Sequence, residues 1–402
     1  MAITILQQPL LFTPVNNEML WSFSSDQTGQ PNFSYKVELY IDTALFGTYE
    51  VYPMQGAFAK FDASEYVRSF LRTHTSTQVD FVCETADQWN TVGIRVYESY
   101  GNPPALEDYA TSANLIGFNG ALRYDKFVTF NHTQYYIDPL NPTYPGWLTY
   151  FPSTEKQFTN YLDPFHAGIL AKKSLTGYEL ILKIYDISGA ETYSFIGYIG
   201  LFERVVMLDI SPSSMDANGW TTGYQWDDCY YYEVVIRATS TIDPSDVAET
   251  QPYRLYFDRS CIRFTHHKLY WMNKFGVLDQ YSFDLLRIDS TQLQSFGYQV
   301  QRGGWNENYY DLTLNDAEKK TAMKTAEDKI ILNSDWMKPA VQNWLVRELY
   351  ESAQVWLRDR DGNFRPVVVE NNQNVLKSRF KDGLIQETVN ITVTWSYRTQ
   401  LN

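Results

Sequence analysis

The chain is 402 residues long, rich in aromatic residues and acidic. Tyr, Phe and Trp form 16% of it, and 47 Asp and Glu against 33 Lys and Arg give a formal net charge of −14. At roughly 150 residues per domain, this length predicts two to four domains with their own cores. So acidic a chain has no general electrostatic hold on phosphate backbones, and we therefore do not expect a nucleic-acid-binding protein.

Cysteine usage and the first residues indicate a reducing compartment. Cys83, Cys229 and Cys261 are odd in number and far apart, which is not a disulfide framework. The opening residues lack a basic region and a small-residue cleavage site, so we expect no signal peptide. No apolar run reaches the length of a membrane span. These features predict assembly in the cytoplasm.

The first hundred residues have the pattern of short strands separated by turns. Residues 35–41 alternate apolar and polar side chains with a period of two, which is typical of a half-buried strand. Further strands are expected at residues 47–52, 78–84 and 91–97. A short helix is predicted after Asp62, which can cap it. Short, turn-bounded strands predict a β-sandwich over residues 1–101.

Residues 102–177 are irregular and rich in proline and aromatic residues. Because this pattern fits neither helix nor strand, we expect a long elaborated loop region here. Such loops commonly carry function or form contacts. Exposed aromatic side chains on loops favour a partner surface. The candidate interface residues are Tyr135, Tyr136, Tyr144, Trp147, Tyr150 and Phe151.

Strand patterns resume at Tyr178 and predict a second β-sandwich over residues 178–300. The last part, residues 301–402, is predicted to be an α+β domain. Its helix would have Pro339 in the first turn, with Ser334 or Asp335 as the cap. A hairpin around Asp361-Gly362 and a long final strand, from about residue 384 to 397, would follow.

No motif in the chain assembles an active site. Residues 359–370 resemble a calcium loop in their acidic spacing, but Phe364 stands where the sharp turn needs glycine, so a hairpin is favoured. His266 and His267 are adjacent on an expected strand, where neighbouring side chains point to opposite faces and cannot easily share a metal. We therefore expect no catalytic, cofactor-binding or metal-binding residues, and no cofactor.

Three stretches together resemble virion structural proteins of tailed bacteriophages of Bacteroides, the crAss-like group among them. The opening segment LLFTPVNNEMLWSFSSDQTGQPNFSYKVELYID resembles their fibronectin-like first module. The segment KLYWMNKFGVLDQYSFDL carries a recurring signature, formed by Tyr270, Trp271, Asn273, Gly276, Asp279, Tyr281 and Phe283. The region SDWMKPAVQNWLVRELYESAQVWLRDRDGNFRPVVVENNQ is similar in its order of helix and strands.

The resemblance implies a mainly β protein of several fibronectin- or immunoglobulin-like sandwich modules with a C-terminal α+β domain. It implies a non-enzymatic structural subunit, forming a ring, collar or hub in the tail or neck around the DNA exit channel. Its partners would be further copies of itself, neighbouring tail, neck or portal-side proteins, and passing DNA that it does not hold specifically. The alternative is a glycan-binding β-sandwich protein whose loop Tyr and Trp residues stack on sugars; a hydrolase with a scattered site is least favoured.

Overall fold

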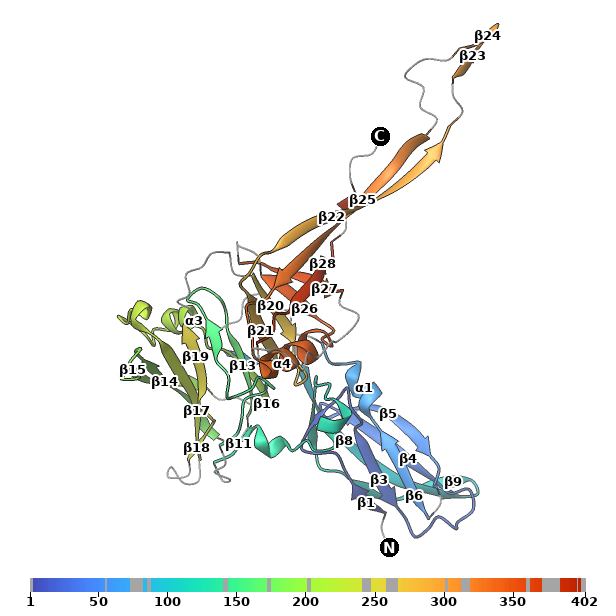
Figure 1. Cartoon of the computed structure of the whole chain (residues 1–402). Helices are drawn as coiled ribbons and strands as arrows, with labels where there is room; N and C mark the ends of the chain where they lie inside the picture. The colour runs from blue at the N-terminus through green and yellow to red at the C-terminus, as the bar shows by residue number, and fades with distance from the viewer. Residues whose placement is uncertain are drawn as a thin grey trace. The chain divides into compact units, whose positions relative to one another are not determined.

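The computed structural model describes residues 3–54, 56–72, 82–84, 88–139, 144–171, 175–200, 204–240, 247–257, 267–300, 303–311, 319–358, 362–370, 384–395 and 397–398. The chain is mainly β with several sheets, as the sequence predicts (Figure 1). It divides into two compact units. The first comprises Met1–Arg259 and Met272–Gln280, and the second comprises Ser260–Trp271 and Tyr281–Asn402.

The first unit begins with a β-sandwich. One sheet has the order β1 (Thr4–Gln7), β3 (Leu20–Ser24), β6 (Phe58–Asp62). The other has the order β2 (Phe12–Pro14), β10 (Leu115–Phe118), β8 (Trp89–Gly101), β4 (Ser34–Ile41), β5 (Ala44–Val51), and β9 (Pro104–Thr111) also pairs with β8. The predicted alternation in β4 is confirmed, because Tyr35, Val37 and Leu39 are completely buried.

A second sandwich follows in the same unit. Its smaller sheet has the order β11 (Tyr136–Ile137), β13 (His166–Ala171), β16 (Arg204–Asp209), β7 (Val82–Glu84). Its larger sheet has the order β12 (Gln157–Thr159), β19 (Tyr253–Phe257), β17 (Tyr231–Ser240), β14 (Leu175–Tyr185), β15 (Glu191–Gly200), and β18 (Val247–Glu249) pairs with β17. Of the predicted strand at residues 78–84, the structure describes residues 82–84. They form β7, which pairs with β16 in this second sandwich.

The first unit also contains short helices. They are α1 (Ser64–Arg68), α2 (Tyr124–Phe127), α3 (Pro212–Ala217) and the 3-10 turns at His132–Gln134 and Trp226–Asp228. The predicted cap of α1 is one residue off: Ala63 occupies the N-cap position, although an oxygen of Asp62 accepts from the amide of Ser64 at 2.9 Å.

A separate apolar cluster in the first unit contains residues from both sandwiches and from the turn at residues 273–277. Its buried members are Phe12, Phe118, Leu122, Leu148, Leu170, Val205, Phe275 and Val277. The turn is held by Asn273, whose side chain donates to Leu148 O at 2.8 Å and accepts from the amides of Phe275 and Val277. Gly276 has φ +74°, and a Cβ there would lie 2.2 Å from Asn119 O, so only glycine fits.

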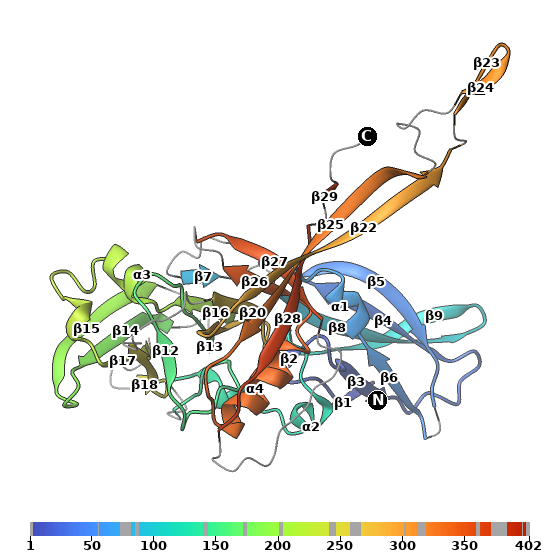
Figure 2. The same cartoon turned by 45° about the horizontal axis from the view of Figure 1, so that its top comes forward.

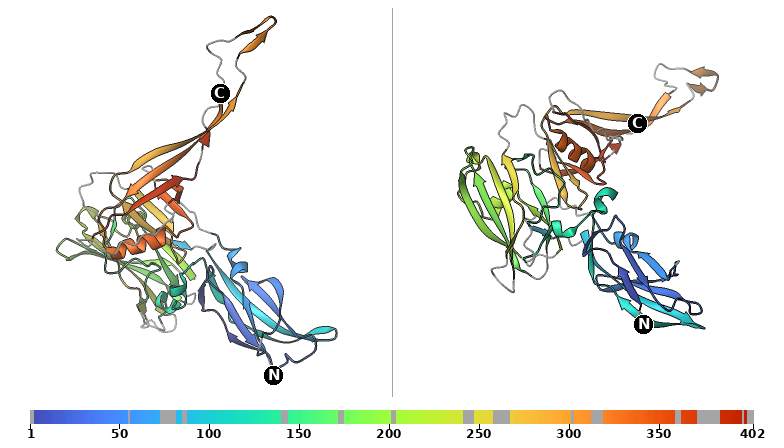
Figure 3. Two further views of the ribbon diagram at one scale, coloured as in Figure 1. Left: turned by 45° about the vertical axis from the view of Figure 1, so that its right-hand side comes forward. Right: turned by 60° about the horizontal axis from the view of Figure 1, so that its bottom comes forward.

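The second unit is built on one sheet. Its order is β21 (Leu278–Phe283), β20 (His267–Met272), β26 (Val355–Arg358), β27 (Phe364–Val369), β28 (Thr388–Val393), β25 (Lys319–Asn333), β22 (Ile288–Gln299), and β29 (Tyr397–Arg398) pairs with β25. Figure 3 shows α4 (Pro339–Leu349) against one face of this sheet. Trp344 of α4 packs on Trp271, with ring centroids 5.3 Å apart.

The predictions for the last hundred residues hold in part. Pro339 does open the helix, but Lys338, not Ser334 or Asp335, occupies its N-cap. Ser334 instead accepts from the amide of Glu387, whose carboxylate accepts from Tyr350 and Gln342. The hairpin β26–β27 is confirmed, although Asp361 lies outside the described residues. The expected long final strand is shorter and is divided into β28 and β29.

Strands β22 and β25 form a long antiparallel arm. They pair from Ile288↔Ile331 to Gln299↔Lys319, and they run side by side away from the rest of this sheet (Figure 2). A small hairpin, β23 (Gly304–Asn306) with β24 (Tyr309–Asp311), stands between them in the sequence.

Sheet pairing corrects the predicted domain boundaries. The expected loop region, residues 102–177, instead contains β9 and β10, which complete the first sandwich, and β11 to β13, which belong to the second. Residues 281–300 were expected in the second sandwich but belong to the second unit. Both differences arise from pairing between strands distant in the sequence, such as β2 with β10, which local patterns do not reveal.

Candidate functional site

A cavity of about 580 Å³ opens in the second sandwich. This volume lies within the range of about 300–1,000 Å³ that is typical of small-ligand pockets. A neighbouring hollow of about 390 Å³ shares Tyr135, Gly146 and Gln251 with it. The larger cavity is lined mainly by residues 146–157, by Glu233 of β17 and by residues of β19.

One wall of the cavity is aromatic. It is lined by Tyr135, Trp147 and Phe151 from the segment before β12. Trp147 is buried, and its indole N–H donates to Gln251 O at 2.8 Å, which fixes the ring. The ring of Tyr253 meets Trp147 edge-on at 5.2 Å. Trp147 is therefore held in place by Gln251 and Tyr253.

Another part of the lining, the polar wall, is set by strand register. On β17 the even-numbered residues Tyr232 and Val234 enter the core, so Tyr231 and Glu233 face outward. The register pairs Glu233 with Arg254, and the guanidinium donates to the carboxylate through Nε at 2.8 Å and through a second nitrogen. Both nitrogens donate to the same carboxylate oxygen, Oε1, and this charge-assisted contact orients both groups.

Gln157 and Tyr253 also line the cavity, but the strand register places them on the inward side of β12 and β19, opposite to Glu233 and Arg254. The Tyr253 hydroxyl donates to the Gln157 side-chain oxygen at 2.8 Å. Burial raises the pKa of Tyr253 well above its ordinary value, so the phenol stays protonated and acts as a donor. Burial would lower the pKa of Arg254, but its hydrogen bonds to Glu233 and Tyr256 raise it, so the guanidinium stays charged.

A tyrosine platform continues from the cavity across the outer face of the larger sheet. We define it as Tyr185, Tyr230, Tyr231 and Tyr256. Tyr185 stacks on Tyr231 with centroids 4.6 Å apart. Arg254 lies 4.9 Å from the Tyr231 centroid, and Lys156 lies 4.6 Å from the Tyr256 centroid. These cation–π contacts pack the charged side chains along the rings.

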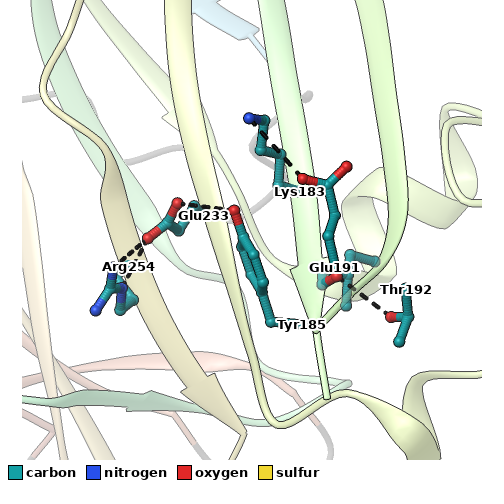
Figure 4. Close-up of polar contacts among 7 residues, drawn as sticks. Lys183, Tyr185, Glu191, Thr192, Glu233 and Arg254 are labelled. Atoms are coloured by element: carbon teal, nitrogen blue, oxygen red, sulfur yellow. Dashed lines mark hydrogen bonds and ion pairs between the residues drawn. The ribbon is translucent and has the colours of Figure 1, made fainter. Parts of the chain in front are cut away.

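Figure 4 shows how the platform connects to the polar wall. Glu233 lies between Arg254 and the Tyr185 hydroxyl, which is 3.4 Å from the second carboxylate oxygen. Burial, followed by the negative charge of Glu233, raises the pKa of Tyr185 to about 12. Lys183 and Glu191 form a separate ion pair at 3.9 Å. The arrangement can hold a ligand through hydrogen bonds and ring contacts.

The six predicted interface residues do not form one exposed surface. Tyr144 is 69% exposed, whereas Trp147 is only 6% exposed. Tyr135, Tyr136 and Tyr150 are partly buried and pack against the apolar cluster around Phe275. The expectation of exposed loop aromatics is thus wrong for these four. Tyr135 and Tyr150 pack on Phe275 of the turn, Tyr136 packs on Phe12, and Trp147 packs on Tyr253.

Three of the six line the cavity in a way that the sequence did not indicate. Trp147 and the partly buried Phe151 contribute to its aromatic wall, together with Tyr135. Contact of the six with a partner stays a prediction.

Sequence reasoning missed Glu233, Arg254, Tyr256 and Lys156. For Glu233, Arg254 and Tyr256, the alternation in β17 and β19 was a signal of outward-facing side chains. The cross-strand register that brings Glu233 to Arg254 could not be read from the sequence, and Lys156 lies outside these strands. His267 is buried, with Nδ1 3.3 Å from a nitrogen of Arg287, while His266 and Asp359 lie outside the described residues. Among the described residues, no three His, Cys, Asp or Glu side chains cluster as a metal site.

A second candidate surface is the arm. Every residue of β22 is exposed, including Leu293 at 58% and Phe296 at 51%. These two residues are three positions apart, so their side chains point to opposite faces of the ribbon. Both faces of the arm are therefore open in the isolated chain.

Comparisons with known proteins leave the family open. No family model and no curated protein matches the chain. Among solved structures, it is similar to dimeric latent PorU from Porphyromonas gingivalis, with 7% identity and a TM-score of 0.21 over 83% of this chain and 32% of that one. It is similar to tripeptidyl peptidase 2 with 9% identity and a TM-score of 0.16, over 98% of this chain and 32% of that one. The chain thus spans about a third of the length of each.

In the part of the chain that the structure describes, no helix has the length and apolar character needed to cross a bilayer.

Proposed function

We propose that this protein is a non-enzymatic structural subunit of a tailed-phage virion, forming a ring, collar or hub in the tail or neck around the DNA exit channel. The observation that carries the proposal is the arm, whose two faces and outer edge are open. The three stretches that resemble virion proteins support a phage virion as the assembly to which the protein belongs.

The arm is built as a segment that needs a partner. A two-stranded ribbon is marginally stable in water by itself. Natural edge strands are usually short or blunted by charges and proline. By contrast, β22 has 12 residues, and no charged residue or proline occurs from Ser290 to Gln299. An open strand edge with Leu293, Phe296 and Tyr298 exposed is suited to burial against another chain.

Charge favours a second copy as that partner. The first unit contains 31 acidic and 16 basic residues, which gives a net charge of −15. The second unit contains 16 acidic and 17 basic residues, which gives a net charge of +1. The distal part of β25 exposes Lys319, Lys320 and Lys324, and the facing residues 291–299 carry no charge. Like charges disfavour the packing of two arms on each other, and the acidic first unit of a neighbouring copy attracts them.

Such a contact is heterologous, because the arm of one copy meets a different surface on the next. Heterologous contacts close into rings when the rotation permits and otherwise form filaments. A ring that is acidic overall is suited to a conduit, since it does not clamp passing DNA.

The test is to measure the mass of the purified chain by light scattering and to image it by negative stain. In the matched variant, an Asn-Gly turn replaces residues 294–325, closing the arm after the Leu293↔Ala326 pair. We expect the intact chain to form closed multimers at low salt and the variant to stay a folded monomer. A monomeric intact chain at every concentration, which also joins no virion component, would overturn the proposal.

A further inference from the structure

We propose that the cavity of the second sandwich binds a neutral oligosaccharide. This site is independent of the arm and of the proposed assembly. It lies wholly within the first unit, between the segment at residues 144–157 and strands β17 and β19.

The two walls match the two aspects of a sugar ring. A pyranose presents a face of C–H groups and an edge of hydroxyl groups. The aromatic wall, with Tyr135, Trp147 and Phe151, offers apolar ring surface to the first. The polar wall, with Glu233 and Arg254, and the inward-facing Gln157 beside it offer planar side chains that can pair with neighbouring hydroxyl groups.

The polar wall and Gln157 are organised before a ligand binds. Glu233 is held by Arg254 and Tyr185, and Gln157 is held by Tyr253. The Glu233 side chain is only 13% exposed. Because these rotamers are already fixed, a ligand loses less free energy in ordering them, which favours affinity.

The charges of the cavity favour a neutral ligand. Two cationic residues, Lys156 and Arg254, line it together with two acidic ones, Glu155 and Glu233. The positive charges are engaged with Tyr256 and Glu233, respectively. The net charge of −14 on the chain further disfavours a polyanionic saccharide.

The experiment titrates the full-length chain with maltotriose, cellotriose, mannotriose and chitotriose, and follows binding by calorimetry and saturation-transfer NMR. We expect at least one of the four to bind. We expect Arg254→Met and Tyr256→Leu each to weaken that binding about tenfold or more, the cost of a lost charged hydrogen bond or ring contact.

Matched controls lie on the same sheet outside the cavity. Lys183→Met removes a positive charge from β14, and Tyr198→Leu removes an exposed ring from β15. Both are expected to bind as the parent does, and thermal unfolding checks that all four variants are folded. The proposal is overturned if no trisaccharide binds, if only an anionic oligosaccharide such as trigalacturonate binds, or if the cavity variants and controls behave alike.

Discussion

Two successive hairpins of the chain have opposite environments. The turn between β20 and β21 carries Phe275, which is completely buried in the apolar cluster of the first unit. The next hairpin, the β22–β25 arm, carries Phe296, which is half exposed. Both hairpins carry an aromatic ring, but of these two rings only that of Phe275 is buried among the residues that the structure describes.

The difference explains the residue choices in each hairpin. At the buried turn, a glycine and an asparagine are required by the backbone and by its hydrogen bonds. On the arm, polar Ser, Thr and Gln side chains alternate with isolated apolar residues, and lysines follow on β25. The arm therefore combines polar side chains with exposed apolar ones, among them Leu293 and Phe296.

The sharpest comparison replaces the two phenylalanines. Phe275→Ala leaves a cavity among packed side chains and is expected to lower the free energy of unfolding by about 3–5 kcal/mol. Phe296→Ala is expected to change it by less than about 0.5 kcal/mol, because the ring is exposed in the monomer. Urea unfolding, followed by tryptophan fluorescence at low protein concentration, measures both. Equal losses would remove the distinction between the hairpins.

Gly276→Ala tests the close approach in the turn. The added Cβ must displace the backbone at Asn119, so we expect a loss of about 3 kcal/mol in unfolding free energy. Gly189→Ala is the control, since that glycine also has positive φ, +81°, but no atom lies within 4 Å of the new Cβ. It should lose only about 1 kcal/mol. Similar losses in the two variants would mean that backbone strain alone matters.

Asn273→Ala removes the hydrogen bonds that hold the turn. Two buried amides, those of Phe275 and Val277, lose their acceptor, and we expect a loss of about 2 kcal/mol. Asn16→Ala is the matched control, because its hydrogen bond to Asn119 is exposed. Denaturant midpoints of the two variants should differ clearly, and coinciding midpoints would argue against a role for Asn273 in stability.

The smallest effect concerns the base of the arm. Hydrogen bonds from Lys329, at 2.7 Å, and from Thr392 lower the pKa of Glu370 below its usual 4.5. Because the pKa of Glu370 is lower in the folded state than in the unfolded state, its ionised form stabilises the fold when the pH is above the unfolded-state pKa. That stabilisation is lost as the pH falls through the folded-state pKa. Because the pair is about a third exposed, we expect roughly 0.5 kcal/mol. Unfolding between pH 6 and pH 3 should show this acid loss in the parent but not in Glu370→Gln.

Sequence reasoning found elements whose pattern is local. The period of two in β4 and the Pro339 start of α4 followed directly from neighbouring residues. The arm was not predicted, because a strand exposed on both faces carries no hydrophobic period. The candidate site was found only in part. Tyr135, Trp147 and Phe151 were singled out, but Trp147 packs on the distant Tyr253 and Tyr135 on the distant Phe275. Glu233 meets Arg254 only through cross-strand register.

Hydrogen exchange along the arm tests the central proposal most directly. Amides of residues 291–299 and 319–325 should exchange rapidly in dilute, high-salt samples and become protected as concentration rises at low salt. Reversing Lys319, Lys320 and Lys324 to Glu should abolish that protection without changing exchange in β4 or α4. Multimers that form while the arm stays unprotected would contradict the account.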